Sequence, residues 1–354
     1  MNIFPISTKV GRKIQCAGQA HLHFSGTAYL GMGTLPEFEN MVVEGIHQYG
    51  PNYGASRGNN VRLTVYEEME SFFAEKAEAE NALVMSSGFL AGYLTAAVLS
   101  DMAGEIWVAP DTHPAILPQG IKRDNFTGFG QFAERCVEES HRFSGRTVAI
   151  FANALDPLTP AIHSYNWVRE LSQKNTYYLL LDDSHAFGLI GKGIYGTYAQ
   201  WKDLPLHLVI SGSLGKALGI PAGVVLGPAS FMEKIASNPI FIGASPPAPG
   251  PCKAFLAAQG LYETQQRTLQ KNMAFFFSRL QGFPGIRYLD NFPVATFHHT
   301  GWAQQLMAKN ILISSFPYPS PDDAPLDRIV LSAHHENEDL LELIRRLEQI
   351  QAYQ

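Results

Sequence analysis

The sequence predicts an α/β fold, in which a large domain is built on a mostly parallel sheet and a small α+β domain follows. Three observations support this prediction. Short apolar runs recur between residues 106 and 226, and they are continuous rather than alternating, which is typical of strands buried on both faces. Helical patterns separate these runs. A stretch rich in proline and glycine at 239–251 then interrupts the alternation.

The elements of the large domain are predicted in chain order from these patterns. A charged, alanine-rich segment at 67–80 and an apolar segment at 90–99 both have helical spacing. A buried strand is predicted at each of the short apolar runs, which lie at 106–108, 147–151, 177–181, 206–210 and 222–226.

The end of the chain follows a different pattern, which predicts the small domain. A long helical pattern covers 253–280, a strand-like run follows at 328–331, and a final helix is expected at 338–351. The predicted boundary lies near residue 240. The expected divisions are an N-terminal segment at 1–45, a large domain at 46–240 and a small C-terminal domain at 241–354.

The composition of the 354 residues excludes several classes of protein. With 46% hydrophobic residues, the chain is too apolar to be disordered. Its 26 basic and 32 acidic residues give a net charge of −6, which argues against a nucleic-acid partner because such a protein needs a basic face. Only 16% of the residues are charged, and we interpret this low fraction as a sign of surface buried between subunits.

Three features of the sequence predict a soluble, cytoplasmic protein. Cys16, Cys136 and Cys252 lie far apart, form no metal-ligand spacing and suit a reducing compartment, so no metal is expected. Residues 1–13 contain no apolar signal core. The most apolar long stretch, 83–99, is interrupted by serine and glycine and is too short and too polar for a membrane span.

Acidic and histidine side chains directly follow one of the predicted strands. The segment 177–188 reads YYLLLDDSHAFG, so Asp182, Asp183 and His185 lie where a buried strand ends. In open α/β sheets, ligands bind beyond the carboxyl ends of the strands, and a carboxylate there needs a nearby cation. An ordinary turn with a capping aspartate and a hydrogen-bonded histidine explains this segment equally well when it is taken alone.

A lysine follows the next predicted strand within a glycine-rich turn. The segment 211–219 reads SGSLGKALG and places Lys216 among three glycines. A lysine in a tight apolar turn can lose its charge and attack a carbonyl, whereas a solvated loop lysine or a phosphate-binding lysine are the alternatives. The usual phosphate-loop motif is excluded because Ala217 follows the lysine and no glycine lies five residues before Gly215.

Three further segments are weak signals when each is taken alone. The segment 86–89, SSGF, precedes a predicted helix, where free N–H groups favour a phosphate, although ordinary helix capping gives the same pattern. His113, in DTHP at 111–114, can lie flat against a ring or simply pack in the fold. Arg328 lies in an apolar strand, where it favours either capture of a carboxylate or an internal ion pair, for instance with Asp327.

The order of these features along the chain is more informative than any one of them. A phosphate turn, a ring-facing histidine, an acid at a strand end, a lysine after the next strand and a late arginine together describe a site for pyridoxal 5′-phosphate. In such a site the lysine forms a Schiff base with the cofactor aldehyde. The acid keeps the pyridine nitrogen protonated, so that the ring accepts electrons.

The sequence resembles the α-oxoamine synthases, a family of fold-type-I pyridoxal-phosphate enzymes in the class I and II aminotransferase superfamily. Members include 2-amino-3-ketobutyrate CoA ligase and 8-amino-7-oxononanoate synthase. The resemblance implies the aspartate aminotransferase-like fold, with a mixed, mostly parallel sheet between helices. It runs from about Tyr29 to the end, and its most specific motifs are LDDSHAFGLIG at 181–191 and SGSLGKALG at 211–219. Weaker matches are YLG at 29–31, SSGFLAG at 86–92, DTHPAI at 111–116, SPP at 245–247 and RIVLSAHH at 328–335.

The resemblance implies a role for each candidate residue. Lys216 would bind the cofactor as a Schiff base and later move the α-proton, Asp182 would pair with the pyridinium nitrogen, and His185 would contact the ring hydroxyl. His113 would stack on the ring, and Arg328 would bind the carboxylate of the amino acid. The residues expected to contact the phosphate are Ser87, Gly88, Phe89 and Ser213.

The sequence departs from the family pattern in segments that normally shape the substrate side. Thr27 and Ala28 precede the YLG motif where the family usually has asparagine. The segment 58–66, GNNVRLTVY, lacks the expected Ser-Gly pair and the later histidine, and the Ser-Met-Asp-Gly turn appears only as ALDP at 154–157. The resemblance therefore does not identify the acyl donor.

The resemblance implies that an amino acid condenses with an acyl-CoA-type thioester and loses its carboxylate to give an aminoketone. It also implies a homodimer with its active site at the subunit interface. Two alternatives remain at this point, because the substrate segments are altered. One is an aminotransferase or another carbanion reaction on an amino acid. The other is a catalytically silent homologue that acts as a binding subunit, against which the retained cofactor residues argue.

Overall fold

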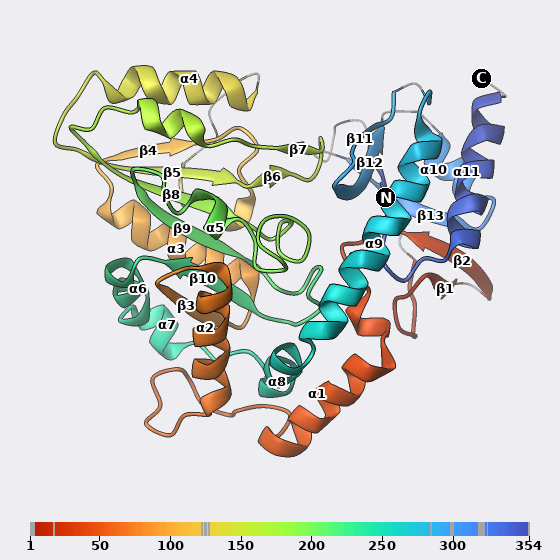
Figure 1. Cartoon of the computed structure of the whole chain (residues 1–354), viewed down its shortest axis with the longest axis horizontal. Coiled ribbons are helices and arrows are strands. Elements are labelled where there is room, and N and C mark those ends of the chain that lie inside the picture. Colours follow the sequence, from red (N-terminus) through yellow and green to blue (C-terminus); the bar gives the residue numbers. More distant parts are fainter. Residues whose placement is uncertain are drawn as a thin grey trace. The chain divides into compact units, whose positions relative to one another are not determined.

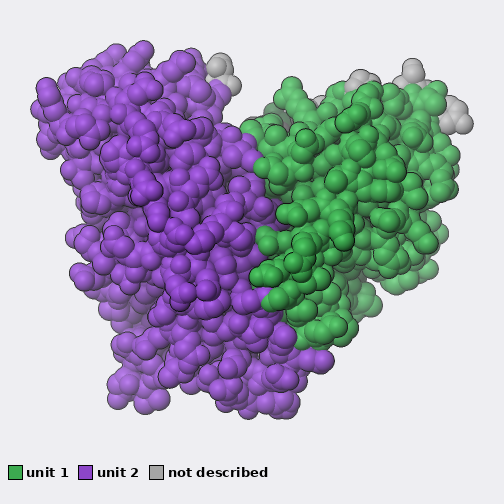
Figure 2. Space-filling model, viewed as in Figure 1, with its two compact units in different colours: residues 1–39, 157–161, 260–354 green, residues 40–156, 162–259 purple. Residues whose placement is uncertain are grey.

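The computed structural model describes two compact units of the chain (Figure 2). Unit 1 comprises 1–39, 157–161 and 260–354, and unit 2 comprises 40–156 and 162–259. The structure describes residues 4–352 except 17, 122, 124, 125, 127, 284, 298–300, 318–322 and 324.

The extents of the two units differ from the three divisions expected from the sequence. Residues 40–45 and 241–259 belong to unit 2 rather than to the terminal parts of the chain. Helix α8 (Pro249–Ala257) explains the second difference, because it packs against α2 (Thr64–Ala77) of the same unit. The assignment of 157–161 to unit 1 is not indicated by any pattern in the sequence.

Unit 2 is built on a six-stranded mixed sheet. Its order is β3 (Asn81–Met85), β10 (Gly223–Gly227), β9 (His207–Ser213), β8 (Thr176–Asp182), β5 (Thr147–Asn153) and β4 (Glu105–Val108). Neighbouring strands from β9 to β4 run parallel, and β10 is antiparallel to both of its neighbours. The predicted mixed, mostly parallel sheet is therefore confirmed, and each of the five apolar runs forms a strand.

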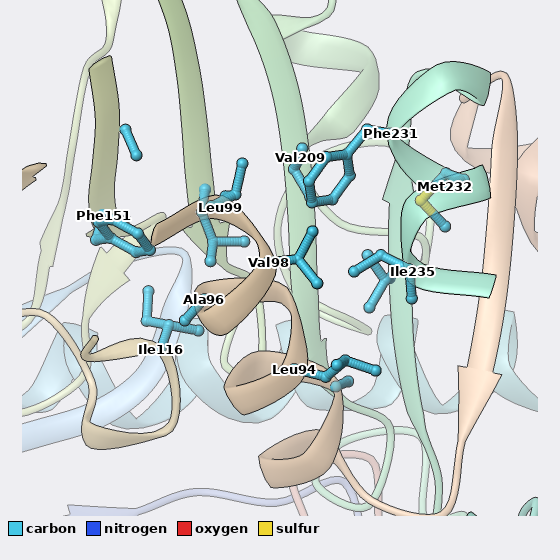
Figure 3. Close-up of a cluster of buried hydrophobic side chains, with 14 of the residues drawn as sticks. Leu94, Ala96, Val98, Leu99, Ile116, Phe151, Val209, Phe231, Met232 and Ile235 are labelled. Carbon is cyan, nitrogen blue, oxygen red and sulfur yellow. The ribbon is translucent and has the colours of Figure 1, made fainter. Parts of the chain in front are cut away.

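Helix α3 (Gly88–Met102) packs on one face of this sheet (Figures 1 and 3). Together with α6 (Ala229–Ala236) it forms a buried cluster against all six strands of the sheet. The cluster includes Leu94, Leu99, Phe151, Leu180, Val209, Val225, Phe231 and Ile235. Each such side chain stabilises the fold by about 1.5–3 kcal/mol through removal of apolar surface from water. The buried hydroxyl of Thr95 donates to the Ala91 carbonyl at 2.7 Å, so this polar group has a hydrogen-bond partner within α3.

A set of aromatic rings around Phe73 of α2 fixes the turn after β8. The Phe73 ring lies 5.5, 5.3 and 5.8 Å from the rings of Phe187, Tyr195 and Phe255, measured between centroids. Phe187 belongs to the turn that follows β8, and Phe255 belongs to α8. Because Phe73 is fully buried, this cluster holds the start of that turn against α2.

Shorter elements complete unit 2. Helix α1 (Pro36–Tyr49) crosses from unit 1 into unit 2 after residue 39. The strands β6 (Leu155–Asp156) and β7 (Ala161–Ile162) form a small two-stranded sheet. The remaining helices are α4 (Phe129–Ser140), α5 (Tyr198–Trp201) and α7 (Pro239–Gly243), with 3-10 turns η2 (Pro114–Ile116) and η3 (Asn166–Glu170).

Unit 1 contains a second six-stranded sheet. Its order is β1 (Lys13–Cys16), β2 (Gln19–Phe24), β13 (Ile311–Pro317), β14 (Pro325–Val330), β12 (Phe292–Phe297) and β11 (Arg287–Leu289). Only β2 and β13 pair in parallel among these described strands. The unit also contains η1 (Met32–Thr34), α9 (Gln259–Leu280), α10 (Trp302–Met307) and α11 (Asn337–Ala352). The strand and final helix predicted near the end of the chain are β14 and α11, whereas β1 and β2 were not predicted.

The single long helix expected at 253–280 is wrong, because the chain leaves the helical conformation at Ala258. Its backbone angles are φ −87° and ψ 15°, which end α8 and let α9 begin at the next residue. The side chain of Gln259 donates from Nε2 to the carbonyl of Phe255 at 2.7 Å. This bond gives a carbonyl in the last turn of α8 a side-chain donor.

Among the residues that the structure describes, no helix is both long enough and apolar enough to cross a membrane. Over the same described ranges, no group of three or more His, Cys, Asp or Glu side chains is arranged to hold a metal ion.

Candidate active site

A row of polar residues lies near the carboxyl ends of three neighbouring strands in unit 2. Asn153 ends β5, Asp182 ends β8 and Ser211 lies on β9, and the three are direct neighbours in the register of the sheet. Paired positions of parallel strands present their side chains on the same face. All three residues are buried, so this edge of the sheet carries polar groups that need polar partners.

The carboxylate of Asp182 is the charged group in this row. Asp182 is 8% exposed, and its Oδ1 accepts a hydrogen bond from the Ser184 N–H at 2.7 Å. Its Oδ2 lies 3.7 Å from Nδ1 of His113, which is longer than a normal hydrogen bond. The lone pairs of Oδ2 are therefore available to a further N–H donor.

The loop after β4 holds the ring of His113 beside Asp182. Nδ1 of His113 accepts a hydrogen bond from the Ala115 N–H at 3.1 Å, which caps η2. The His113 N–H donates to Oδ1 of Asn153 at 3.0 Å. Because Nδ1 is an acceptor, the neutral ring carries its proton on Nε2. The side chain is still 44% exposed, so the ring is fixed but accessible.

His113 is influenced by the charges of Asp182, Lys216 and Arg123. Burial lowers the pKa of His113 below its usual range, the carboxylate of Asp182 opposes this shift, and the charges of Lys216 and Arg123 reinforce it. The imidazole is therefore neutral at neutral pH, which suits contact with the face of a flat ring. Asp182 and Lys216 act on one imidazole although they follow different strands.

The turn that carries Lys216 is closed by its own hydrogen bonds. Oγ of Ser213, at the end of β9, accepts from the Gly215 N–H at 3.2 Å. The Ile220 N–H donates to the Leu214 carbonyl at 3.1 Å and closes the other side of the turn. Lys216 lies between these two bonds and is half-buried, so the backbone defines where its side chain starts.

The start of α3 is in direct contact with the end of β9. A Cβ on Gly88 would lie 2.4 Å from both Cα and Cβ of Ser213, and a Cβ on Gly223 would lie 2.2 Å from the Ser87 carbonyl oxygen. Both positions require glycine because backbone segments touch there. Oγ of Ser87 caps α3 by accepting from the Leu90 N–H at 3.1 Å. The N–H groups of this first turn and the Ser213 hydroxyl thus lie together, an arrangement that favours a phosphate.

The turn after β8 is joined to the turn after β9. Oγ of Ser184 accepts from the Ser213 N–H at 2.9 Å, and a Cβ on Gly212 would lie 2.7 Å from the Ser184 nitrogen. His185 follows Ser184 and is half-buried in this turn. Any shift of the Lys216 turn is therefore transmitted to the turn that carries Asp182 and His185.

Arg328 lies in unit 1, on β14. It is 7% exposed, and its Nε and Nη2 have no hydrogen-bond partner among the described residues. Burial raises the pKa of Tyr29 to about 12, although the charge of Arg328 and a hydrogen bond to it oppose this shift. A buried guanidinium with two unpaired nitrogens is costly unless an anion binds it, and a carboxylate matches its geometry.

Most of the candidates predicted from the sequence belong to one contiguous set of contacts in unit 2. These are Ser87, Gly88, His113, Asp182 and Ser213, and the charge of Lys216, in the turn after Ser213, acts on His113. His185 and Phe89 are chain neighbours of this set, and the ring of Phe89 is 60% exposed and stacks on that of Tyr93. Arg328 belongs to unit 1 and is described with that unit.

The sequence analysis missed Asn153, which holds the loop of His113. Besides its bond to His113, Asn153 donates from Nδ2 to the carbonyl of Asp111. A signal was present, because TVAIFAN at 147–153 is an apolar run that ends in an amide, just as the run before Asp182 ends in an acid.

The chain is similar to several known proteins. It matches the family described as aminotransferase class I and II over residues 157–347, more than half of its 354 residues. It is 27% identical over 239 residues to an 8-amino-7-oxononanoate synthase of Aromatoleum aromaticum, an alignment that covers 65% of this chain and 61% of that protein. It is 24% identical over 370 residues to a putative 8-amino-7-oxononanoate synthase of Rippkaea orientalis, covering 99% of this chain and 94% of that protein.

The fold is similar to that of a solved structure of SPT, serine palmitoyltransferase, with its PLP internal aldimine. The TM-score is 0.82 at 16% identity, and the alignment covers 98% of this chain and 92% of that one. At this level of identity the likeness concerns the fold, and it confirms the fold-type-I arrangement that the sequence predicts.

The carboxyl of Asp183 makes stability depend on pH. Asp183 is fully buried and accepts bonds from the N–H and hydroxyl of Thr197 at 2.6 and 2.8 Å, and burial raises its pKa to about 7 from a usual 3.8. Between about pH 4 and pH 7, the folded protein therefore holds a proton that the unfolded chain has lost. The stability contributed by this group is complete below pH 4 and is lost as the pH rises towards 7.

We expect Asp183→Asn, which is neutral at every pH, to lose this dependence. Thermal unfolding between pH 5 and pH 8 measures it: the melting temperature of the unchanged protein should fall relative to that of the variant as pH rises. Asp203→Asn, at an exposed position of the same unit, is the matched control. Parallel curves for the protein and Asp183→Asn would contradict the assignment.

Proposed function

The chain belongs to the aminotransferase class I and II family, and from this premise we propose that it is a transferase dependent on pyridoxal 5′-phosphate. It condenses an amino acid with an acyl-CoA-type thioester, which releases CO₂ and free CoA and leaves an aminoketone. The observation that carries the proposal is the set of contacts that joins His113 and Asp182, through Ser184 and Ser213, to the first turn of α3, with Lys216 in the turn that follows Ser213. The relatives named 8-amino-7-oxononanoate synthase support a thioester as the second substrate.

The residues of unit 2 fit the phosphate and the ring of this cofactor. The first turn of α3 would bind the phosphate. It lies directly against Ser213, because Gly88 has no side chain to separate the two segments. The groups proposed for the phosphate are the N–H groups of Gly88 and Phe89, the Ser213 hydroxyl and Ser87. The ring would lie against the accessible face of His113, with its hydroxyl near His185.

Asp182 has the properties that the ring nitrogen requires. When bound, pyridoxal 5′-phosphate supplies an electron sink for the charge left when a bond to the α-carbon of an amino acid breaks. Asp182 would hold a proton on the ring nitrogen, because its Oδ2 makes no short hydrogen bond to His113 and its burial strengthens a charge-assisted bond. This proton keeps the sink effective.

Lys216 is proposed to carry two functions at one atom. Its Nζ would hold the cofactor through the aldehyde, and as a free amine it would remove the proton from the substrate α-carbon. As a free amine, Nζ is the group that would accept this proton. The closed turn around Lys216 fixes the origin of the side chain in both functions.

Arg328 is proposed to bind the carboxylate of the amino acid. Its unpaired Nε and Nη2 form the fork that a carboxylate occupies with two parallel hydrogen bonds. A fixed carboxylate decides which bond of the α-carbon stands perpendicular to the cofactor ring, and hence which bond breaks. Tyr29 would keep the guanidinium in place from the other side.

The same residues leave two other functions open to test. In an aminotransferase, Lys216 would return the proton to a carbon of the cofactor and an oxo-acid would leave. In a catalytically silent binding subunit, an amino acid would produce no change in the bound cofactor. The altered segments 58–66 and 154–157 favour neither alternative over the condensation.

The first prediction for this function concerns Lys216. We expect Lys216→Ala to abolish the visible absorbance band that a lysine-bound cofactor gives, because the variant has no Nζ to attach the aldehyde. Absorbance spectra of the two proteins, purified with added pyridoxal 5′-phosphate, make the comparison. Lys192→Ala, which removes an exposed lysine of the same unit, should leave the band unchanged. A variant that keeps the band would contradict the assignment of Lys216.

The second prediction separates the reactions. When the enzyme is mixed with each amino acid in turn and a panel of acyl-CoA thioesters, we expect free thiol to appear for at least one pair. The released thiol and CO₂ are measured together, since condensation with decarboxylation yields one of each. Oxo-acid with pyridoxamine phosphate would instead indicate an aminotransferase, and no spectral change with any amino acid would indicate a binding subunit.

We also propose that two copies of the chain form the working enzyme. Several large apolar side chains are exposed on unit 2, and burying them against a second copy would remove them from water. They are Val43, Ile46, Val61, Phe89, Tyr93, Ile240 and Ile242. Light scattering after size exclusion should give twice the 39.0 kDa mass of one chain, and Ile240→Asp with Ile242→Asp should lower it. A mass of one chain at all concentrations would remove this proposal.

We propose a cytoplasmic location because the cysteines, all of which the structure describes, form no disulfide. Cys16 and Cys252 are buried free thiols, and a reducing compartment maintains thiols in that state. Burial raises the pKa of the Cys252 thiol to about 12, so that it stays protonated and unreactive.

A further inference from the structure

Asp111 and His163 form a pair beside the candidate active site that has no part in the roles proposed above. Nε2 of His163 lies 2.6 Å from Oδ2 of Asp111, and their side chains are 9% and 16% exposed. Charge-assisted contacts of this length are among the stronger hydrogen bonds in proteins. Oδ1 of Asp111 has no hydrogen-bond partner among the described residues, so His163 supplies the bond that anchors this carboxylate.

Two aromatic rings fix the orientation of His163. The ring of Phe129 stacks on the imidazole with 3.9 Å between centroids and 7° between planes. Tyr165 packs edge-on against Phe129 at 5.5 Å, and its hydroxyl donates to the Asn153 carbonyl at 2.5 Å. The imidazole therefore cannot turn without disturbing this stack, and Nε2 presents its proton at one fixed place.

Asn153 connects the pair to His113. Its side chain binds the backbone on both sides of Thr112, through the Asp111 carbonyl and the His113 N–H. The Thr112 hydroxyl donates to the Phe151 carbonyl at 2.9 Å and ties the middle of the loop to β5. The three residues 111–113 are thus held by their backbone at β5 and by the Asp111 side chain at His163.

We propose that the Asp111–His163 pair is a positioning element that sets the orientation of the His113 ring. Only two peptide bonds separate the anchored residue from the ring, so a rotation of the chain at Asp111 turns the Cα–Cβ bond of His113. The Ala115 N–H bond to Nδ1 then breaks or lengthens, and the ring leaves its place near Asp182. The consequence for the cofactor rests on the proposed function, whereas the positioning of the ring concerns this chain alone.

Two substitutions of His163 separate positioning from packing. His163→Phe keeps a ring that stacks on Phe129 and removes the hydrogen-bond donor. His163→Gln keeps an N–H donor for Asp111 and loses the ring. If the pair only stabilises the core, the phenylalanine variant should resemble the unchanged protein more closely. If the pair positions His113, the glutamine variant should do so.

The first measurement needs no cofactor. Exchange of the backbone N–H groups of residues 111–117 with deuterium reports the Ala115 bond to His113. We expect His163→Phe to accelerate this exchange about tenfold and His163→Gln to accelerate it less, because the bond opens more often when the loop loses its anchor. We expect the melting temperature of His163→Gln to be lower than that of His163→Phe, because the glutamine variant loses the ring that stacks on Phe129.

The second measurement uses the protein loaded with pyridoxal 5′-phosphate. We expect the visible circular dichroism of the bound cofactor to decrease in His163→Phe, with kcat about tenfold lower and KM for the amino acid little changed, since a misplaced ring affects the reacting geometry more than binding. Glu139→Gln is the control. It removes a carboxylate of α4 that pairs with Arg135 and Arg142 in the same unit, and it should change neither signal.

Each outcome decides the proposal. The proposal is overturned if His163→Phe shows the same exchange and circular dichroism as the unchanged protein. It is also overturned if these two signals change more in His163→Gln than in His163→Phe. If His163→Phe does not fold, the same measurements compare Asp111→Asn with Asp111→Ala. Asp111→Asn keeps an oxygen acceptor and loses the charge, whereas Asp111→Ala loses both. We expect the alanine variant to be the more altered of the two. If the unchanged protein binds no pyridoxal 5′-phosphate, the proposed function fails, and the exchange measurement still tests the positioning.

Discussion

The buried carboxylate of Asp182 is the constraint on which the arrangement of this part of unit 2 depends. A charge that is 8% exposed is tolerated only with donors and cations around it. The Ser184 N–H donates to this carboxylate, the His113 ring lies 3.7 Å from it, and the charge of Lys216 acts on that same ring. Their convergence requires the parallel order of β8 and β9, so the polar site and the apolar sheet support each other.

Much of this arrangement is predictable because its signals are local in the sequence. A continuous apolar run marks a strand buried on both faces, and the polar residue that ends it marks the edge where ligands bind. Asp182 and Lys216 can be placed in this way, since each follows a run that forms a strand in the fold. The glycines around Lys216 indicate a tight turn for the same reason, because their conformational freedom is a property of the residues themselves.

The features that could not be predicted depend on partners that are distant in the sequence. β2 is short, and its pairing with β13 near the other end of the chain is not indicated by any pattern around it. Likewise, nothing around His163 indicates that it meets Asp111, and nothing around Ala258 indicates that two helices divide there. In each case packing decides the outcome, and local propensity is only a weak guide.

The contact of Gly88 with Ser213, and of Gly223 with Ser87, has a consequence for the order of folding. The first turn of α3 cannot reach its final shape until two strands made more than a hundred residues later are in place. Contacts of such separation close late because the loop between them loses much entropy. A nascent or truncated chain that ends before β10 would therefore contain helix α3 but would lack a finished phosphate cradle.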